Sequence, residues 1–233
     1  MSIIELKEVT KEYEIGEKKL LAADKISFTI EEGEFVVILG PSGAGKSTVL
    51  NLLGGMDYVS SGEILVKGKN IAKYNDDQLT WYRASEVGFI FQFYNLIPTL
   101  TALENVALIK NIVKQALNPA AVLEAVGLGE HLNKFPSQLS GGEQQRVSIA
   151  RAVCKNPTLM LCDEPTGALD SETGAVILEL LQKMSREEHK TVIIVSHNAS
   201  LADAADKVIR IKNGRITEII HNEDPLSVSE VSW

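Results

Sequence analysis

The sequence predicts an α/β protein with a mostly parallel central sheet, an N-terminal antiparallel β-subdomain and an inserted helical subdomain. Apolar runs at residues 35–40, 158–164 and 191–197 are typical of strands in a parallel sheet that is covered on both faces. Short runs separated by turn residues fill the first part of the chain and favour antiparallel pairing. Residues 93–153, between these parts, carry helix signals.

The composition is that of a soluble globular protein, with 233 residues, 45% hydrophobic and 23% charged. The net charge of −8 and the pI of about 5.1 disfavour binding to nucleic acid through its phosphates, so we expect no nucleic-acid partner. No apolar run approaches the roughly 20 residues that span a bilayer, and no signal peptide is visible at "MSIIELKEVT". Cys154 and Cys162 match no metal-ligand spacing, so we expect reduced thiols in the core of a cytoplasmic protein.

The N-terminal part is expected to form strands separated by turns at "EEGE" and "SSGE". The four strand-like runs are residues 3–13, 25–30, 35–40 and 62–68. After the third run comes a glycine-rich turn, and the segment "KSTVLNLLGGM" then places apolar residues at helical spacing. We therefore expect a strand, a loop and a helix in immediate succession.

The middle of the chain is expected to be a helical insert. A strand at residues 87–92 precedes it, and the insert covers residues 93–153. The segment "TALE" (101–104) has the pattern of a capping box, while Asn118 and Pro119 suit the N-cap and first position of another helix.

The alternation of strands and helices then resumes. The helical stretch "SETGAVILELLQKM" separates two apolar strands, and residues 207–220 resemble a β-hairpin with a type I′ turn at Asn213 and Gly214. We expect one domain at residues 1–220, followed by a loose acidic tail at residues 221–233.

The segment "GPSGAGKST" predicts a phosphate site and hence the core of a P-loop NTPase. Gly43 and Gly45 let the backbone curl, so that successive N–H groups converge on phosphate oxygens. Lys46 suits the β- and γ-phosphates of ATP, and the Ser47 hydroxyl suits Mg²⁺. The expected phosphate-binding residues are Gly40, Pro41, Ser42, Gly43, Ala44, Gly45, Lys46, Ser47 and Thr48.

The segment "LMLCDE" supplies two carboxylates at the end of an expected strand. Asp163 is predicted to hold Mg²⁺ on the side of the phosphate loop. Glu164 is predicted to orient or deprotonate the attacking water. Such acid pairs also serve as helix caps or solvated charges, and only the nearby phosphate loop favours catalysis.

Three further side chains admit two interpretations each. His197 and Gln92 both end expected strands at the same sheet edge, where His197 suits the γ-phosphate and Gln92 suits water or Mg²⁺. Tyr13 precedes a polar turn, where its ring could stack on a base. The alternatives are a structural histidine, a structural amide and an aromatic on an edge strand.

The stretch "LSGGEQQR" (139–146) predicts a second helix N-terminus with exposed N–H groups. Ser140 and Glu143 have the spacing of a capping box. A cap does not need Gly141 and Gly142, and each of these glycines lowers helix stability by roughly 1 kcal/mol. We therefore expect something to approach the backbone closely at this point.

These motifs, in this order and spacing, resemble those of an ATP-binding-cassette (ABC) ATPase over residues 1–220. The signature of that family is "LSGGE" (139–143), accompanied here by the phosphate loop, Gln92, "LMLCDE", "GALD" and His197. The segments "FQFYNLIPTLTALENV" and "DEPTGALDS" are similar to the branch that includes lipoprotein-release, macrolide-export and peptide-antibiotic-resistance ATPases.

The resemblance implies a homodimer that closes head to tail on two ATP molecules and hydrolyses them. In such a dimer the signature of each chain would close over the ATP held by the other. Ser140, Gly141, Gly142 and Glu143 would therefore bind the partner's ATP, and Asp170 of "GALD" would cross the same interface.

The resemblance also implies a separate transmembrane permease, which this chain would power from the inner face of the cell membrane. The alternative within the family is an ATPase that drives a permease-like partner to control cell-wall hydrolysis or division without moving a substrate. The cassette residues leave both possibilities open.

Overall fold

The computed structural model describes residues 2–16, 18–91, 94–167 and 169–231. The roles predicted for Gln92 fall outside these ranges. The described strands are β1 (Ser2–Ile15), β2 (Lys18–Glu31), β3 (Phe35–Leu39), β4 (Ser61–Val66), β5 (Lys69–Asn70), β6 (Val87–Ile90), β7 (Leu159–Asp163), β8 (Thr191–Ser196), β9 (Lys207–Lys212) and β10 (Arg215–His221).

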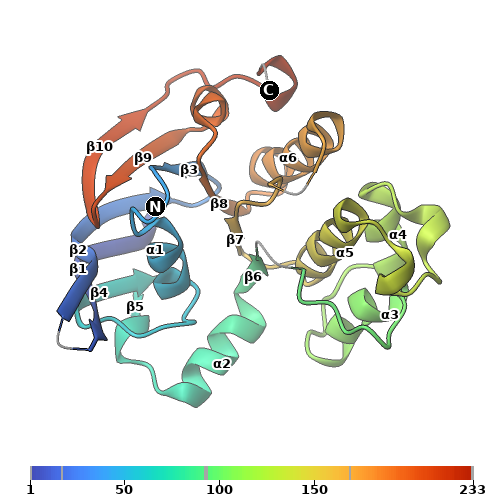
Figure 1. Ribbon diagram of the computed structural model, residues 1–233, viewed down its shortest axis with the longest axis horizontal. Helices are drawn as coiled ribbons and strands as arrows, with labels where there is room; N and C mark the ends of the chain where they lie inside the picture. Colours follow the sequence, from blue (N-terminus) through green and yellow to red (C-terminus); the bar gives the residue numbers. More distant parts are fainter. Residues whose placement is uncertain (1, 17, 92–93, 168, 232–233) are drawn as a thin grey trace.

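The α-helices alternate with these strands (Figure 1) and are α1 (Lys46–Leu53), α2 (Asp76–Ser85), α3 (Ala102–Ala107), α4 (Pro119–Ala125), α5 (Gly141–Cys154) and α6 (Ser171–Arg186). Short 3₁₀ turns join them at η1 (Ile71–Lys73), η2 (Leu108–Asn111), η3 (Gly129–His131), η4 (Pro136–Gln138), η5 (Ala199–Ala204) and η6 (Val228–Glu230).

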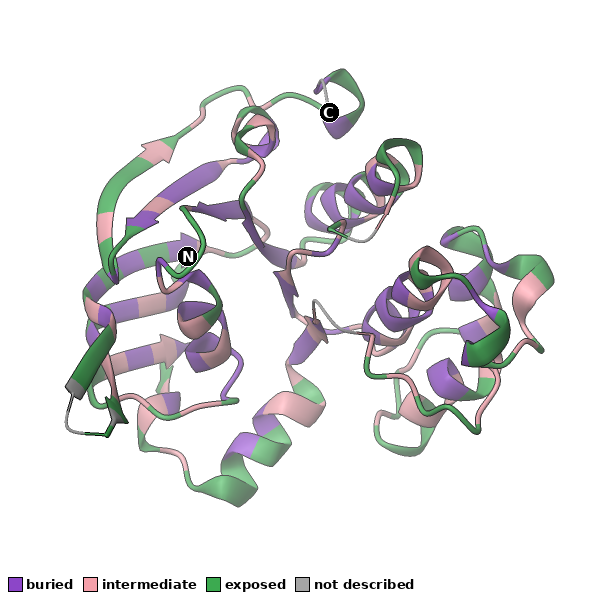
Figure 2. Ribbon diagram, in the orientation of Figure 1, coloured by how far each residue is buried: buried purple, intermediate pink, exposed green. Residues whose placement is uncertain are grey.

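The central sheet has six strands in the order β10-β9-β3-β8-β7-β6. All neighbouring pairs from β9 to β6 are parallel, and only β10 runs antiparallel. Every residue of β3 is buried. Val37 faces a core shared with α5 and α6, while Ile38 faces a core shared with α1 and the N-terminal sheet. The predicted sheet, covered on both faces, is confirmed (Figure 2).

The N-terminal sheet is antiparallel where it was predicted to be, in the order β2-β1-β4-β5. Its strand β2 begins at Lys18 rather than at residue 25. Helix α1 packs between this sheet and the central sheet, because Val49, Leu50 and Leu53 share a core with residues of both. The helix that begins beside the phosphate loop is therefore fixed from two sides.

Helices α3, α4 and α5 lie together at the right of Figure 1 and form the helical part, which shares one apolar core with α6 and the central sheet. The predicted capping box of Thr101 is confirmed, as is the predicted N-cap Asn118 with proline at the first helical position. Helix α2 was not predicted, although Asn75 caps it through a reciprocal hydrogen bond with Gln78.

The chain ends in a hairpin and a packed tail. Asn213 and Gly214 both have positive φ, 51° and 74°, which confirms the type I′ turn. The expectation of a loose tail is wrong for its described part: Val228 is fully buried, and its N–H donates to Oε1 of Gln182 in α6. The buried apolar side chain and this hydrogen bond hold η6 against the domain.

Two simpler expectations concern thiols and membrane spans. Both cysteines are buried free thiols, as predicted. Among the described residues, none of the helices combines the length and the apolar character that a membrane crossing demands.

Candidate functional site

The phosphate loop, residues 40–48, leaves the end of β3 and runs directly into α1. Gly43 and Gly45 have φ of 74° and 99°, in the left-handed region that favours glycine. A Cβ on Gly45 would overlap the carbonyl oxygen of Ala22, and one on Gly40 would overlap that of Ile211. The loop is therefore wedged against two other segments, which fixes the direction of its N–H groups.

Lys46 opens α1 with its side chain folded back over the loop. Its Nζ donates to the carbonyl oxygens of Gly40 (2.9 Å) and Pro41 (3.1 Å), and the residue is only 7% exposed. The two carbonyl partners hold the Lys46 ammonium beside the N–H groups of the loop. The loop and the lysine together form a preorganised site for an anion.

Ser47 and Asp163 join the phosphate loop to the end of β7. The Ser47 hydroxyl donates to Oδ1 of Asp163 at 3.0 Å. Burial raises the pKa of Asp163, and the neighbouring charge of Glu164 raises it further. A hydroxyl and a carboxylate that is short of compensating charge are the oxygen donors that Mg²⁺ accepts alongside phosphate and water. The two residues fit a magnesium site.

Glu164 and His197 meet because β7 and β8 are parallel neighbours, with Asp163 opposite Val195. The Nδ1 atom of His197 lies 3.0 Å from both carboxylate oxygens of Glu164. The Glu164 side chain is 17% exposed and that of His197 is 74% exposed. Glu164 also has a φ of 49°, in the left-handed region that non-glycine residues rarely adopt.

Tyr13 is held by two residues that the sequence analysis did not identify. Its hydroxyl donates to Oδ2 of Asp57 at 2.7 Å, and the Lys11 ammonium lies 4.8 Å from its ring centroid. Lys11 also donates to Oδ1 of Asp57 at 2.6 Å. Burial, followed by the hydrogen bond to Asp57, raises the pKa of Tyr13. The orientation of the Tyr13 ring is therefore fixed, because Asp57 binds both the Tyr13 hydroxyl and the Lys11 ammonium that lies over the ring.

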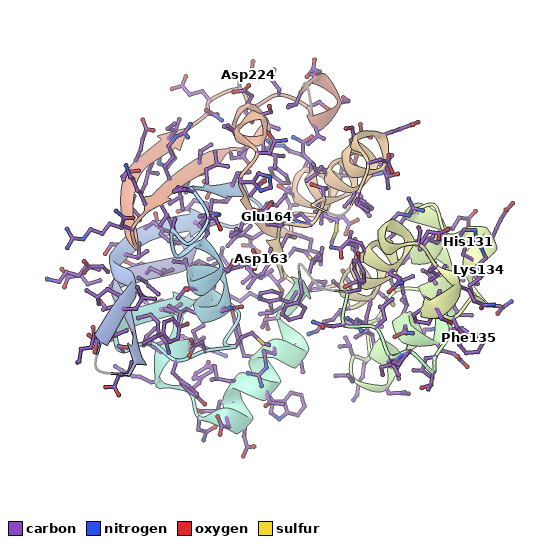
Figure 3. The ribbon with its side chains drawn as sticks, in the orientation of Figure 1. His131, Lys134, Phe135, Asp163, Glu164 and Asp224 are labelled. Carbon is purple, nitrogen blue, oxygen red and sulfur yellow. The ribbon has the colours of Figure 1, made fainter. Side chains whose placement is uncertain are left out.

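One cavity of about 890 Å³ gathers most of these groups. Its lining includes Tyr13, the loop residues 42–48, Asp163, Glu164 and His197. Figure 3 shows Asp163 and Glu164 near the centre of the molecule, where the central sheet meets α1.

The cavity wall also contains residues that the sequence analysis missed. They include Tyr94, from the segment after β6, and Gly214, from the β9–β10 turn, together with residues 20–22 of β2. Short-range signals did not reveal them, because no local motif connects these segments to the phosphate loop. Gly167, in the segment after β7, also lines the cavity and begins the "GALD" motif named above.

The signature residues form a separate structure at the start of α5. The Ser140 hydroxyl accepts the N–H of Glu143 (3.2 Å), and a Glu143 carboxylate oxygen accepts the N–H of Ser140 (2.6 Å), which confirms the capping box. Ser140 and Gly141 are exposed, and within the described chain residues 140–143 do not line the cavity. A Cβ on Gly141 would lie 2.8 Å from the Tyr94 hydroxyl. The close approach expected at this backbone is therefore made at Gly141 by Tyr94 of the same chain.

Asp170 is likewise outside the cavity lining. It caps α6 by accepting the N–H of Thr173 at 2.9 Å, and this hydrogen bond, with smaller help from Arg146, lowers the pKa of Asp170. Most of the predicted residues that are described thus fall into two groups, one that lines the cavity and one at the N-termini of α5 and α6, where Ser140, Gly141 and Asp170 are exposed.

Comparisons with known proteins give a consistent family. Residues 23–167 match the family described as ABC transporter. An uncharacterized ABC transporter ATP-binding protein of Thermotoga maritima is 45% identical over 93% of this chain and 94% of its own length. A macrolide export ATP-binding/permease protein, MacB of Syntrophobacter fumaroxidans, is 40% identical over 93% of this chain and 31% of its own length.

Solved structures agree with these relatives. The dimeric structure of MJ0796, an ABC transporter cassette, superposes with a TM-score of 0.89 at 43% identity, covering 94% of this chain and 98% of that one; the protein is from Methanocaldococcus jannaschii. A dimeric post-hydrolysis state of the same cassette, bound to ADP and Pi, has a TM-score of 0.87 at 42% identity.

Proposed function

The chain belongs to the ABC transporter family of ATP-binding proteins, and from that premise we propose that two copies of it build two shared ATP sites that drive a separate membrane permease. The protein is the ATP-binding and ATP-hydrolysing subunit of an ABC transporter. The proposal concerns what each residue does at ATP, how the copies pair and where the permease docks.

In the proposed site the phosphate loop and Lys46 hold the phosphates of ATP. Ser47 and Asp163 would hold Mg²⁺, which would supply positive charge to the phosphate oxygens. Glu164 would accept a proton from the water that attacks the γ-phosphate in line. His197, 3.0 Å from Glu164, would orient that carboxylate and contact the γ-phosphate.

At the other end of the cavity, Tyr13 would bind the base. Asp57 anchors its hydroxyl and Lys11 lies over its ring, so the ring does not need to be ordered when the nucleotide arrives. Stacking tolerates any base and contributes affinity rather than sequence information.

The separation of the two groups of residues is the observation that carries the proposed pairing. The phosphate loop is built into a cavity, whereas the signature, at the N-terminus of α5, exposes Ser140 and Gly141 outside the lining of that cavity. Such a terminus attracts an anion. A second copy, placed head to tail, would bring its signature and Asp170 to the open side of this chain's ATP. The dimeric structures of a 43% identical cassette support such a pairing.

We place the permease at a groove between the central sheet and the helical part. The groove has a volume of about 270 Å³ and includes Met56, Phe89, Phe91 and Ile109, with Arg83 at its rim. An apolar floor with basic groups fits a short helix of a membrane protein better than free solvent. The relative named as an ATP-binding/permease protein supports such a partner, and the chain would then lie on the cytoplasmic face of the membrane.

Mixing two disabled chains tests the shared site. Lys46→Ala removes the ammonium from a chain's own phosphate loop, and Gly142→Asp puts a negative charge at its signature. In a mixed dimer, the intact loop of the Gly142→Asp chain faces the intact signature of the Lys46→Ala chain, while the other site carries both lesions. We expect ATPase activity in the mixture that neither parent shows.

Cross-linking must first demonstrate that mixed dimers form. Where a complex needs two working sites for turnover, ATP-dependent dimerisation of the mixture replaces the rate as the readout. Mixed dimers that gain nothing in either assay would show that the signature does not serve the neighbouring chain.

A further inference from the structure

At the start of α5, each of the two carboxylate oxygens of Glu143 contacts a different residue. One oxygen, Oε2, accepts the N–H of Ser140 at 2.6 Å and so closes the capping box. The other, Oε1, lies 2.8 Å from Nδ1 of His131, the last residue of η3. The two side chains are 18% and 26% exposed. Glu143 therefore connects the first residues of the signature to a segment on the outer side of the helical part (Figure 3).

The contact between His131 and Glu143 has the length of an ion pair but not hydrogen-bond geometry. Nδ1 of His131 is buried and has no hydrogen-bond partner among the described residues. The attraction therefore depends on the charge of the imidazole, which a histidine ordinarily gains and loses between pH 5 and 8.

The other charged groups near the pair come from the segment around His131 and from helices α3 and α4. The N–H of Ser140 is the main cause that lowers the pKa of Glu143, and the charges of His131 and Lys134 lower it further. Helix α3 packs against the same segment through backbone hydrogen bonds to Leu132 and Lys134, and its Glu104 is bound to Thr101. Helix α4 contributes Glu124, whose side-chain stem is the group that a Cβ on Gly129 would meet, and Glu130 precedes the histidine. Among the residue types named here, histidine is the one whose ordinary charge change falls between pH 5 and 8.

We propose that His131 is a positioning residue for the signature: through Glu143 it fixes the first turn of α5, and its protonation tightens the signature that a second copy of this chain presents to ATP. The inference rests on the proposed function, because it concerns the signature as a shared part of the ATP site. His131 does not touch ATP in this scheme. It acts by holding the carboxylate that holds Ser140.

A pH profile distinguishes this role from a structural one. ATPase rates of the parent and of His131→Gln are compared from pH 6 to pH 8, and their ratio cancels the titration of every other group. We expect the parent to be about two- to fivefold faster at pH 6, the size of a partly exposed ion pair, and the ratio to approach one at pH 8. His131→Arg, charged throughout, should keep its advantage over His131→Gln at both ends.

Two controls accompany the profile. In a Glu143→Gln background, His131→Gln should have no further effect at any pH, since the charged partner is gone while the amide can still accept the Ser140 N–H. ATP affinity of the isolated chain, measured by calorimetry, should not change with His131. A ratio that stays constant with pH, or an equal effect in the Glu143→Gln background, overturns the inference.

Mixed dimers separate this inference from the proposed function. His131→Gln should reduce the recovered rate when it is on the Lys46→Ala chain, which supplies the working signature, and should be silent on the Gly142→Asp chain. Recovery that is insensitive to His131 on either chain removes the positioning role and leaves the shared site intact. A parental mixture without recovery contradicts the shared site itself, while the pH profile of the homodimer still decides the role of His131.

Discussion

The phosphate loop and the signature both lead into helix N-termini, yet they are held in opposite ways. The loop is fixed by segments distant in sequence: Gly45 abuts Ala22, Gly40 abuts Ile211, and Ala44 accepts the N–H of Gly214 at 2.9 Å. The signature is fixed by neighbours, through the capping box of Ser140 with Glu143 and the contact to His131.

The difference indicates what each region is for. A loop wedged against β2 and the β9–β10 hairpin suits a ligand that always binds in one position. A locally capped, exposed terminus keeps its own shape through neighbouring residues. The first arrangement fits the preformed part of an ATP site, and the second fits our proposal that the signature is presented to a second copy.

The largest expected effect is that of Glu164→Gln, which should prolong the state in which the phosphate loop of one chain meets the signature of the other. In Glu164→Gln the amide has nearly the shape of the carboxylate but cannot accept a proton from water, so turnover should fall about 10²- to 10⁴-fold while ATP still binds. With ATP no longer consumed, dimers should accumulate, and light scattering with and without MgATP measures them. A mutant that hydrolyses ATP at the parental rate removes Glu164 from its role.

The second prediction compares an alanine substitution at one glycine of the phosphate loop with one at a glycine of the signature. Gly45→Ala forces a side chain against the Ala22 carbonyl at a φ of 99°, so ATP affinity should fall about 100-fold or more. Gly141→Ala meets the Tyr94 hydroxyl, which can shift, so ATP affinity of the isolated chain should be retained. Calorimetric titration measures both affinities.

Gly43→Ala is the matched control for this pair. Its φ of 74° imposes the same kind of strain, but its added Cβ meets open space, so its loss should lie between the other two. Thermal unfolding of all three variants separates lost binding from lost folding. Equal losses for Gly45→Ala and Gly141→Ala would refute the contrast between a wedged loop and an adjustable one.

The smallest expected effect is on ATP affinity and comes from Tyr13, at the base end of the cavity. Tyr13→Ala removes the stacking surface and should weaken ATP binding about 5- to 150-fold, with little change in the rate at saturating ATP. Tyr13→Phe keeps the ring but loses the hydrogen bond to Asp57, so its loss should be smaller. Unchanged affinity in the alanine variant, by titration calorimetry, would reduce Tyr13 to an aromatic on an edge strand.

The sequence predicted what depends on neighbouring residues. Strand β3, the phosphate loop and α1 follow from one continuous pattern, and the caps at Thr101, Asn118 and Ser140 follow from spacings of a few residues. The buried runs that become β7 and β8 likewise indicated a parallel sheet before its neighbours were known.

What depends on distant contacts was missed. Tyr94 and Gly214 join the cavity only because the central sheet brings their loops to one edge. The tail was expected to be loose because it lacks periodicity, but the buried Val228 and the side chain of Gln182 suffice to hold it. Asp57 and Lys11 beside Tyr13 show no local pattern, since their ion pair joins two different elements of the N-terminal part.

The position of β3 in the sheet has a consequence for biosynthesis. This strand pairs with β8 and β9, which the ribosome makes last among the strands that flank the phosphate loop. At a synthesis rate of 5–20 residues per second, roughly 10–30 s pass between translation of the loop and of these supporting strands. Throughout that interval the nascent chain carries the phosphate-loop sequence without the walls that shape it. The walls of the ATP site are therefore completed only after β8 and β9 have emerged.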